Sequence, residues 1–360
     1  MTTGLLLMSL VATTNPTPTD SVERQFGIRL YRGFIIPHAP DLRDISQTRP
    51  TGIELTYSRT AFSREAYERC NCFARVGAYA NYGAFGNPAE LGRTYGAGGF
   101  FEPLIRYRQP LYFSLRATAG LAYLTRVYNA ETNPRNTFFG ASISGMLALS
   151  AGAHYRLTDR LHLSATASYN HISNGGTRQP NRGMNFPTVG LGMIYVANPH
   201  PFPNPRMWVQ PALHRRLTTR ILTVGSARVL PKTSSASEQV AWVWGITATA
   251  GHRLSQFHAV TGGVEFLDDR YVRGQLQREN ITTNHRQLGL LGGYELWLGR
   301  YIFSTHLGWN VYQPTGLLGS RAFQRYQLLY MFRKRWLIGV GLKARLNVAE
   351  GFEARMGLQF

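Results

Sequence analysis

Residues 171–185 combine the residue types that nucleophilic hydrolysis requires. His171 and Ser173 are separated by one residue, so both side chains point to the same face if the segment is an extended strand. A serine hydroxyl becomes an effective nucleophile when a neighbouring base takes its proton, and a histidine imidazole is such a base. The segment 174–184 is rich in Gly and Asn, and its N–H groups could stabilise an oxyanion. The spacing therefore favours acyl-transfer chemistry on Ser173 and His171.

The strand that leads into this pair has one apolar and one polar face. Odd-numbered residues from Leu161 to Tyr169 are apolar, and His171 and Ser173 continue that face. Polar groups on a lipid-facing stripe are costly and tend to be functional. Asn185 lies on the same face of the next strand, and in a simple hairpin it falls roughly opposite Ser173. We expect the three polar side chains to cluster on an outer wall, near one rim.

The same alternation of apolar and polar residues recurs along the whole chain, and it is typical of half-buried strands. Many of the alternating stretches are ten residues or longer, which exceeds an ordinary soluble strand and suits a tilted strand that crosses a bilayer. The stretches are 27–36, 51–60, 72–84, 94–108, 111–123, 138–156, 160–173, 185–197, 219–230, 239–253, 257–267, 285–298, 301–312, 323–333, 336–346 and 352–360.

Two all-β folds are compatible with this pattern: a soluble sandwich with its apolar faces inward, and a membrane barrel with its apolar faces toward lipid. The length of the strands, polar faces rich in Gly, Ser, Thr and Arg, and an alternating last strand that ends in Phe360 favour the barrel. We predict an antiparallel transmembrane β-barrel of about 14 strands, within a range of 12–16. Residues 23–360 are expected to form this single barrel.

A proline-rich segment, 198–212, interrupts the pattern of strands. Proline cannot donate a ladder hydrogen bond, so the segment is a connection. It could be a long turn, or the seam between a smaller barrel and added strands. We favour one domain, because a single closed barrel would need both halves.

Composition restricts the class of protein further. The 39 Lys and Arg against 19 Asp and Glu make a net charge of +20, and charged residues are only 16% of the chain. This much apolar and aromatic content excludes a disordered chain, and no apolar run is long enough for a bundle of transmembrane helices. The charge predicts anionic partners. The basic residues form no nucleic-acid-binding motif, so clusters such as 214–220 and 333–335 are interpreted as strand ends that meet lipid phosphates.

Three smaller features complete the prediction. Residues 1–22 are expected to be a signal peptide with a polar lead-in, because 4–12 form a short apolar core, although no Lys or Arg precedes it. Cys70 and Cys72 could bind a metal or be redox-active, but two incidental thiols are the favoured interpretation. The histidines show no metal-ligand spacing, and no cofactor motif is present, so neither a metal nor a cofactor is expected.

The segment HISNGGTRQPNRGMN resembles the active-site segment of the lipid A 3-O-deacylases, the PagL-type outer-membrane barrels of the acyloxyacyl hydrolase family. The resemblance extends over about 70–200, more weakly at 129–139, and 201–360 has no counterpart in the eight-stranded family barrel. It implies an outer-membrane esterase of a Gram-negative bacterium that removes an ester-linked acyl chain from lipid A of lipopolysaccharide, its partner in the outer leaflet. In that mechanism Ser173 is the nucleophile, His171 is the general base, and Asn174 and Gly176 lie at the oxyanion hole.

One position departs from the family pattern. Asn185 occupies the position of the family's catalytic Glu. An amide can orient an imidazole, but it cannot stabilise the imidazolium by charge, so slower chemistry is expected. Another carboxylate, such as that of Glu102, could substitute, or activity could be lost. The alternative prediction is therefore a weak or inactive deacylase-like barrel that serves as a channel or a structural protein.

Overall fold

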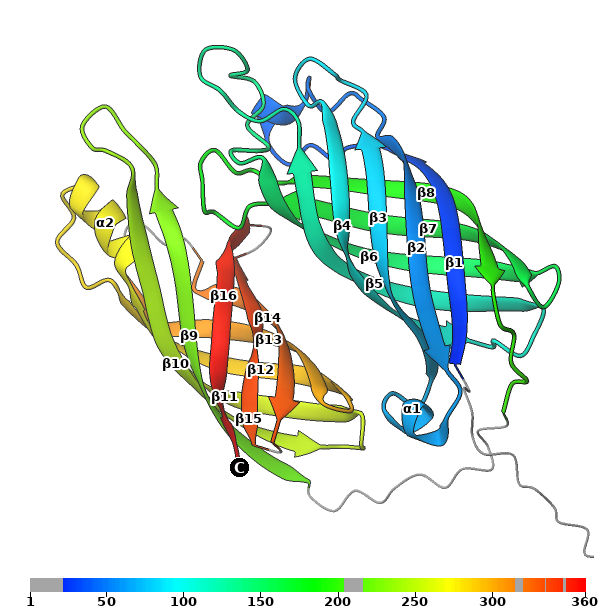
Figure 1. Cartoon of the computed structure of the whole chain (residues 1–360). Helices are drawn as coiled ribbons and strands as arrows, with labels where there is room; N and C mark the ends of the chain where they lie inside the picture. The colour runs from blue at the N-terminus through cyan, green and yellow to red at the C-terminus, as the bar shows by residue number, and fades with distance from the viewer. Residues whose placement is uncertain (1–21, 204–215, 315–319, 334, 346–347) are drawn as a thin grey trace, which may run out of the picture.

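A computed structural model describes residues 22–203, 216–314, 320–333, 335–345 and 348–360. Within them, sixteen strands form two closed antiparallel barrels of eight strands each (Figure 1). The N-terminal barrel consists of β1 (Val22–Gly33), β2 (Thr51–Ala61), β3 (Phe73–Ala84), β4 (Arg93–Ile105), β5 (Leu111–Leu124), β6 (Ile143–Arg156), β7 (Leu161–Ser173) and β8 (Met184–Val196). The C-terminal barrel consists of β9 (Leu217–Leu230), β10 (Gln239–Arg253), β11 (His258–Asp269), β12 (Arg286–Leu298), β13 (Tyr301–Tyr312), β14 (Ala322–Phe332), β15 (Trp336–Arg345) and β16 (Val348–Gln359).

The prediction of a single barrel of about 14 strands is wrong, although an all-β fold is confirmed. β8 pairs with β1, from Gln25 opposite Val196 to Gly33 opposite Thr188, and this ladder closes the first barrel without any later strand. β16 pairs with β9 and closes the second barrel in the same way. The proline-rich connection therefore joins two complete barrels. Alternation reports which face of a strand is buried, whereas closure depends on pairing between residues far apart in sequence.

Outward-facing side chains of both barrels are apolar, as the alternation predicted. Leu191 on β8 is 73% exposed and Leu307 on β13 is 72% exposed, which in water would be an unfavourable surface. Trp242, Trp309 and Trp336 are also exposed on the C-terminal barrel, and tryptophan is enriched where a barrel meets the membrane interface. Among the described residues, no helix is long and apolar enough to cross a membrane. The two α-helices are short, α1 (Arg64–Glu68) and α2 (Arg270–Arg278).

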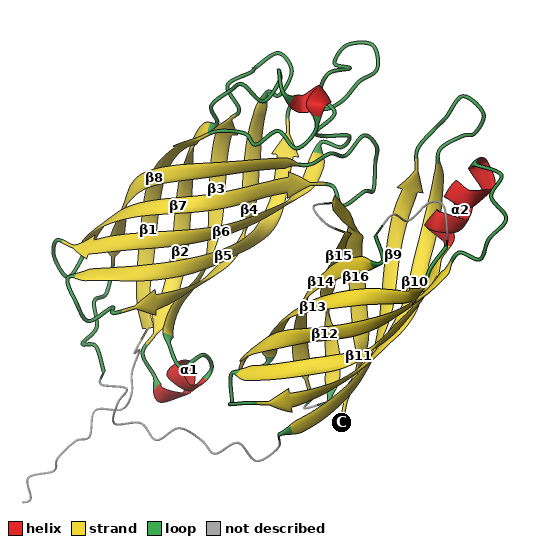
Figure 2. Ribbon diagram, turned by 180° about the vertical axis from the view of Figure 1, so that it is seen from behind, coloured by secondary structure: helices red, strands yellow, loops and turns green. Residues whose placement is uncertain are grey.

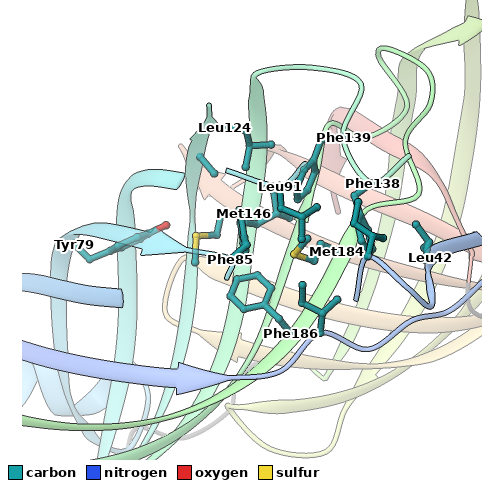
Figure 3. Close-up of a cluster of buried hydrophobic side chains, with 14 of the residues drawn as sticks. Leu42, Tyr79, Phe85, Leu91, Leu124, Phe138, Phe139, Met146, Met184 and Phe186 are labelled. Carbon is teal, nitrogen blue, oxygen red and sulfur yellow. The ribbon is translucent and has the colours of Figure 1, made fainter. Parts of the chain in front are cut away.

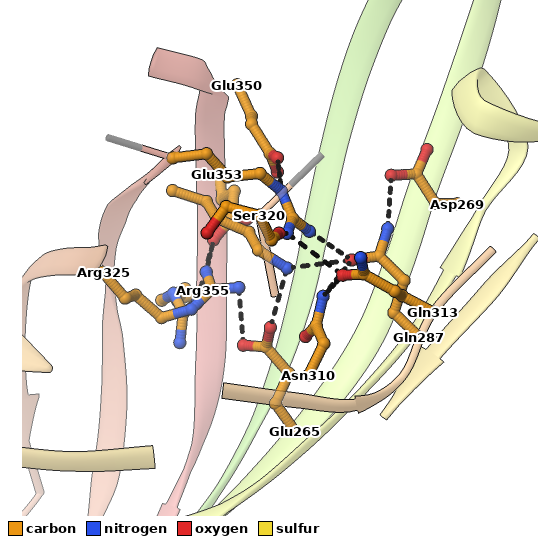
Figure 4. Close-up of polar contacts among 12 residues, drawn as sticks. Glu265, Asp269, Gln287, Asn310, Gln313, Ser320, Arg325, Glu350, Glu353 and Arg355 are labelled. Atoms are coloured by element: carbon orange, nitrogen blue, oxygen red, sulfur yellow. Dashed lines mark hydrogen bonds and ion pairs between the residues drawn. The ribbon is translucent and has the colours of Figure 1, made fainter. Parts of the chain in front are cut away.

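Inside the C-terminal barrel, charged side chains neutralise one another instead of lining a pore (Figure 4). Lys343 Nζ lies 3.2 Å from Glu265 Oε1, and an Arg355 guanidinium nitrogen lies 2.9 Å from Glu353 Oε2. Arg325 pairs with both glutamates. An eight-stranded barrel encloses just enough space for its own side chains, so this lumen is a packed polar core.

The sequence suggested that the basic cluster 214–220 lies together at a strand end, but the structure separates its described residues. Arg220 is buried in the lumen, where its guanidinium pairs with Glu295, while Arg216 is exposed. His214 and Arg215 lie outside the described residues. A buried arginine needs an acidic partner to offset the loss of hydration, and the inward face of β12 provides one.

One end of the N-terminal barrel is closed by a cluster of buried apolar side chains (Figure 3). Phe138 and Phe139 come from the segment between β5 and β6, and Leu42 comes from the segment between β1 and β2. Ile172 and Met184 face inward from β7 and β8 and pack into the same cluster. These two residues alternate along the strands with His171, Ser173 and Asn185. Because Ile172 and Met184 point into the barrel, the three polar side chains lie on the outer face.

The longer connections of the N-terminal barrel lie at this capped end, including 34–50, 125–142 and 174–183. At the opposite end, the turns 106–110 and 157–160 are short, and the longer connection 62–72 is folded into α1 and the turn that follows it. Outer-membrane barrels place short turns toward the periplasm and longer loops outside, so the capped end is the extracellular one.

The remaining sequence predictions concern the N-terminus and the cysteines. The expected signal peptide lies outside the described residues, apart from Val22, which begins β1. Cys70 and Cys72 form a disulfide, so the interpretation as incidental thiols is wrong. The two residues sit in the connection between β2 and β3, where a short turn after α1 brings the sulfurs together. A disulfide is consistent with a compartment outside the cytosol.

Candidate active site

His171 and Asn185 face each other across the β7–β8 ladder at the extracellular rim. The two residues are directly paired in register, and Asn185 Oδ1 lies 2.7 Å from His171 Nδ1. The prediction that Asn185 lies opposite Ser173 is therefore wrong by two residues, because the β7–β8 ladder ends at the pair Ile172–Met184 and the connection that follows already includes Ser173. Direct cross-strand neighbours on one face are the closest pairs in a sheet. The amide thus holds the imidazole ring from the side of Nδ1, and Nε2 has no hydrogen-bond partner in the part of the chain that the structure describes.

Ser173 ends β7, and its hydroxyl is held by the loop that follows. The backbone N–H of Gly175 donates to Ser173 Oγ at 3.1 Å, and Asn181 Nδ2 donates at 3.0 Å. Asn181 Oδ1 accepts from the N–H of Asn174 at 3.1 Å. Ser173 is on the outer face of the barrel but is only 7% exposed, because the loop folds back over it.

Gly183 separates the ring of His171 from Ser173. A Cβ at this position would lie 3.0 Å from His171 Cε1 and 3.4 Å from Ser173 Cβ. His171 and Ser173 therefore flank one small space, although among the described residues no hydrogen bond joins Ser173 Oγ to His171. Hydrogen bonds between catalytic groups are often long without substrate, and a rotation about the Cα–Cβ bond of Ser173 moves Oγ.

If His171 and Ser173 act together on an ester, replacing Gly183 by alanine is expected to lower the rate of ester hydrolysis by roughly tenfold or more, because the new methyl group would occupy the space between the two residues. The φ of Gly183 is +69°, so alanine also adds backbone strain of about 1–2 kcal/mol. Gly299→Ala is the matched control: its φ is +64°, but its Cβ would meet only Arg69 side-chain and backbone atoms at 3.4 Å or more. Equal activity losses in the two variants would assign the effect to strain and contradict the prediction.

The predicted oxyanion residues lie in the same loop, but their polar groups are engaged within it. The N–H of Gly176 donates to Asn174 Oδ1 at 2.9 Å, and Asn174 Nδ2 donates to the carbonyl of Arg178 at 2.8 Å. The donors nearest to Ser173 Oγ are instead Gly175 N–H and the Asn181 amide. Sequence reasoning assigned no role to these two residues, although both belong to the motif on which the family resemblance rested.

The site loop is supported by the segment 129–139, whose resemblance to a family loop was weaker. The N–H of Arg182 donates to the carbonyl of Thr137, and the N–H of Gly183 donates to the carbonyl of Phe138, both at 3.1 Å. Phe138 is itself fixed in the apolar cluster that closes the barrel. The position of Gly183 is therefore set by a second loop that is anchored in the core.

Glu102 does not substitute for the missing carboxylate of Asn185. It points into the lumen from β4, where its Oε1 accepts a hydrogen bond from Ser114 Oγ at 2.6 Å and pairs with Arg75 at 3.2 Å. Its inward direction follows from strand alternation, because even-numbered residues of β4 such as Phe100 and Leu104 are buried as well. Within the described ranges, no group of three His, Cys, Asp or Glu side chains is arranged to hold a metal ion.

Two family models match the chain, and each match lies within one of the two barrels. Residues 60–193 match the model described as "Lipid A 3-O-deacylase (PagL)", and residues 218–360 match "Acyloxyacyl hydrolase, C-terminal domain". The chain belongs to the lipid A 3-O-deacylase (PagL) family. The PagL match begins at the end of β2 and contains the whole β7–β8 site. The expectation that 201–360 has no counterpart in the eight-stranded family barrel is refined by the second match, which assigns 218–360 to a separate C-terminal domain.

Several solved outer-membrane proteins are similar to this PagL-family chain. Neisserial surface protein A is 13% identical, with a TM-score of 0.32, and the match covers 49% of this chain and 97% of that one. Omp33 of Acinetobacter baumannii is 10% identical, with a TM-score of 0.18 and coverage of 95% and 99%. No curated protein matches the chain.

The family membership and the apolar outer face agree on location. A PagL-family protein whose two barrels both carry lipid-facing side chains is an outer-membrane protein of a Gram-negative bacterium. At the level of the family, the protein is a hydrolase.

Proposed function

We propose that this protein hydrolyses an ester-linked acyl chain of lipid A, with Ser173 as the nucleophile and His171 as the general base. The observation that carries the proposal is the contact between His171 and Asn185 on the lipid-facing wall, next to Ser173. A base held at Nδ1 presents Nε2 toward the nucleophile, which is the arrangement of serine hydrolases.

The reaction proceeds in two acyl transfers. His171 Nε2 takes the proton of Ser173 as Oγ attacks the ester carbonyl, and the oxyanion that forms is stabilised by loop donors. Asn174 and Gly176 remain the predicted donors, and the N–H of Gly175 and the Asn181 amide lie close enough to share the role. The proton passes from His171 to the departing sugar alkoxide, which leaves an acyl-serine. His171 then deprotonates a water molecule that releases the fatty acid and restores Ser173.

The location of the site suits a substrate that stays in the membrane. Ser173 and His171 face lipid at the extracellular rim, so an acyl ester in the outer leaflet reaches them laterally, without entering a lumen. Arg178 and Arg182 are exposed in the adjoining loop and can meet the phosphates of lipid A. The overall charge of +20 favours the same anionic surface and requires no nucleic acid as a partner.

A channel is not favoured, because an open lumen would need a larger barrel. Both barrels have eight strands, and their interiors hold ion pairs and buried side chains. The purified protein is expected to show no stepwise conductance in a planar bilayer, with a known porin as the positive control. Steady single-channel currents from the purified chain would contradict this and restore the channel alternative.

The proposed activity is tested by mass spectrometry of lipid A from cells that express the protein. The expected result is the loss of one ester-linked acyl chain, together with the matching free fatty acid. Lipid A of unchanged mass, from cells in which the protein is shown to reach the outer membrane, would overturn the proposal.

A further inference from the structure

The C-terminal barrel contacts the N-terminal barrel at the candidate active site. In Figures 1 and 2 the loop between β7 and β8 meets the upper end of β16, and both views agree. The carbonyl of Gly176 accepts a hydrogen bond of 3.3 Å from the N–H of Val229, at the end of β9. A Cβ built on Gly351 of β16 would lie 3.6 Å from the carbonyl oxygen of Gly175. The loop that holds Ser173 thus rests against the second barrel.

The place where this loop rests is an incomplete part of the second barrel. β16 begins at Val348, but its ladder with β9 extends only from Ala354 to Gln359. β9 in turn continues past Gly225, the partner of Ala354, to Leu230. The two strands therefore diverge at the extracellular end, and the loop from the first barrel provides the acceptor for Val229 there. An edge N–H that would otherwise lie unpaired beside lipid is satisfied in this way.

Phe352 extends from this diverging end of β16 toward the glycines around Ser173. A Cβ on Gly175 would overlap the Phe352 ring, and a Cβ on Gly145 would lie 3.9 Å from its Cε2. Gly145 is the residue of β6 that lies directly opposite Ser173. Glycine at 145 and 175 leaves room beside the nucleophile, and the aromatic ring forms the far side of that room. Phe352 is still 38% exposed, so part of the residue is accessible to a ligand.

The surfaces that lead away from this space are apolar. Leu147 and Leu149 follow Gly145 on the outer face of β6, and both are exposed. Met356 continues the outer face of β16 below Phe352. An acyl chain that leaves the space beside Ser173 along either strand would therefore lie on apolar side chains, which is the environment that an extended acyl chain prefers.

We infer that the C-terminal barrel completes the substrate site, with Phe352 forming one wall of the acyl-chain groove and so selecting for the length of the acyl chain. This inference rests on the proposed function. Its occupant is the long acyl chain of the ester whose carbonyl lies at Ser173. The backbone of Phe352 is fixed for this role, because its carbonyl accepts a 2.7 Å hydrogen bond from Ser226 Oγ of β9.

The inference is tested with the full chain in liposomes, by comparing hydrolysis of a dodecanoyl and a butanoyl nitrophenyl ester. Phe352→Ala is expected to lower kcat/KM for the dodecanoyl ester by about tenfold and to change the butanoyl value by less than about twofold. Phe303→Ala is the matched control, because Phe303 is also an exposed phenylalanine, on β13, and its side chain is 45% exposed against 38% for Phe352. Phe352→Leu, a smaller change, serves if the alanine variant fails to assemble. An unchanged ratio of the two kcat/KM values in both Phe352 variants would overturn the inference.

A second readout separates this inference from the proposed function. The Ser173→Ala protein is irradiated with a lipid A analogue whose ester-linked acyl chains carry a diazirine, and the adducts are mapped by peptide mass spectrometry. The peptide that contains Phe352 is expected to carry several-fold more label than the peptide that contains Phe303. Equal labelling of the two peptides overturns the groove, whether or not the wild type hydrolyses esters. Failure of ester hydrolysis in the wild type, together with selective labelling at Phe352, would instead refute the chemistry and leave the groove supported.

Discussion

Ser173→Ala is expected to lower the rate of lipid A deacylation by at least about a thousandfold, because the variant has no side-chain oxygen to form the acyl intermediate. The lesion is confined to chemistry. Among the described residues, the hydrogen bonds of Ser173 Oγ are to Gly175 and Asn181 of its own loop, so the barrel ladder is unaffected. The rate is measured as fatty acid released from lipopolysaccharide micelles, after heat-modifiability on a gel shows that the barrel is folded.

Ser168→Ala is the matched control for this experiment. Ser168 lies on the same strand, but it faces the lumen and is buried there. It is expected to retain activity within about twofold of the wild type, since a lumenal hydroxyl has no access to lipid. Residual activity of Ser173→Ala close to that of Ser168→Ala would exclude Ser173 as the nucleophile.

Asn185→Asp is expected to increase kcat by about tenfold to a hundredfold, which is the opposite direction from most active-site substitutions. Aspartate has the shape of asparagine, so a carboxylate oxygen takes the place of Oδ1, which lies 2.7 Å from His171 Nδ1. The carboxylate accepts the same hydrogen bond and in addition stabilises the positive charge that forms on His171 in the transition state. Asn185→Glu, which restores the family residue, is expected to change kcat in the same direction.

Two further variants decide how this result is interpreted. Asn185→Ala removes the contact and is expected to lower kcat by roughly tenfold, because the imidazole loses its orientation. The double variant Ser173→Ala, Asn185→Asp is expected to be inactive, which assigns the gained activity to Ser173. If neither carboxylate variant is faster than the wild type, residue 185 does not act on His171 during the reaction in the way that the geometry predicts.

The sequence by itself determined the faces of the strands and the chemistry that they could carry. Alternation predicted sixteen stretches close to the observed strands, and the odd parity of His171, Ser173 and Asn185 predicted a common outer face, which agrees with the burial of the alternating Ile172 and Met184. These properties follow from local geometry, since successive side chains of a strand point to opposite faces whatever the strand pairs with. The composition likewise excluded disorder and helical membrane bundles without any knowledge of pairing.

Tertiary structure decided how many barrels those strands make, and which residues meet. Closure of β1 on β8 joins residues more than 150 positions apart, and no local pattern encodes that choice. The register that places Asn185 opposite His171 depends on a loop whose path is fixed by its hydrogen bonds to 137–138. The burial of Arg220 and Glu102 inside the lumens, and the meeting of Phe352 with Gly145 and Gly175, arise only when separate strands are assembled. Long-range pairing and side-chain packing are properties of the closed barrels, which is why sequence periodicity could identify the wall of the site but not its complete surroundings.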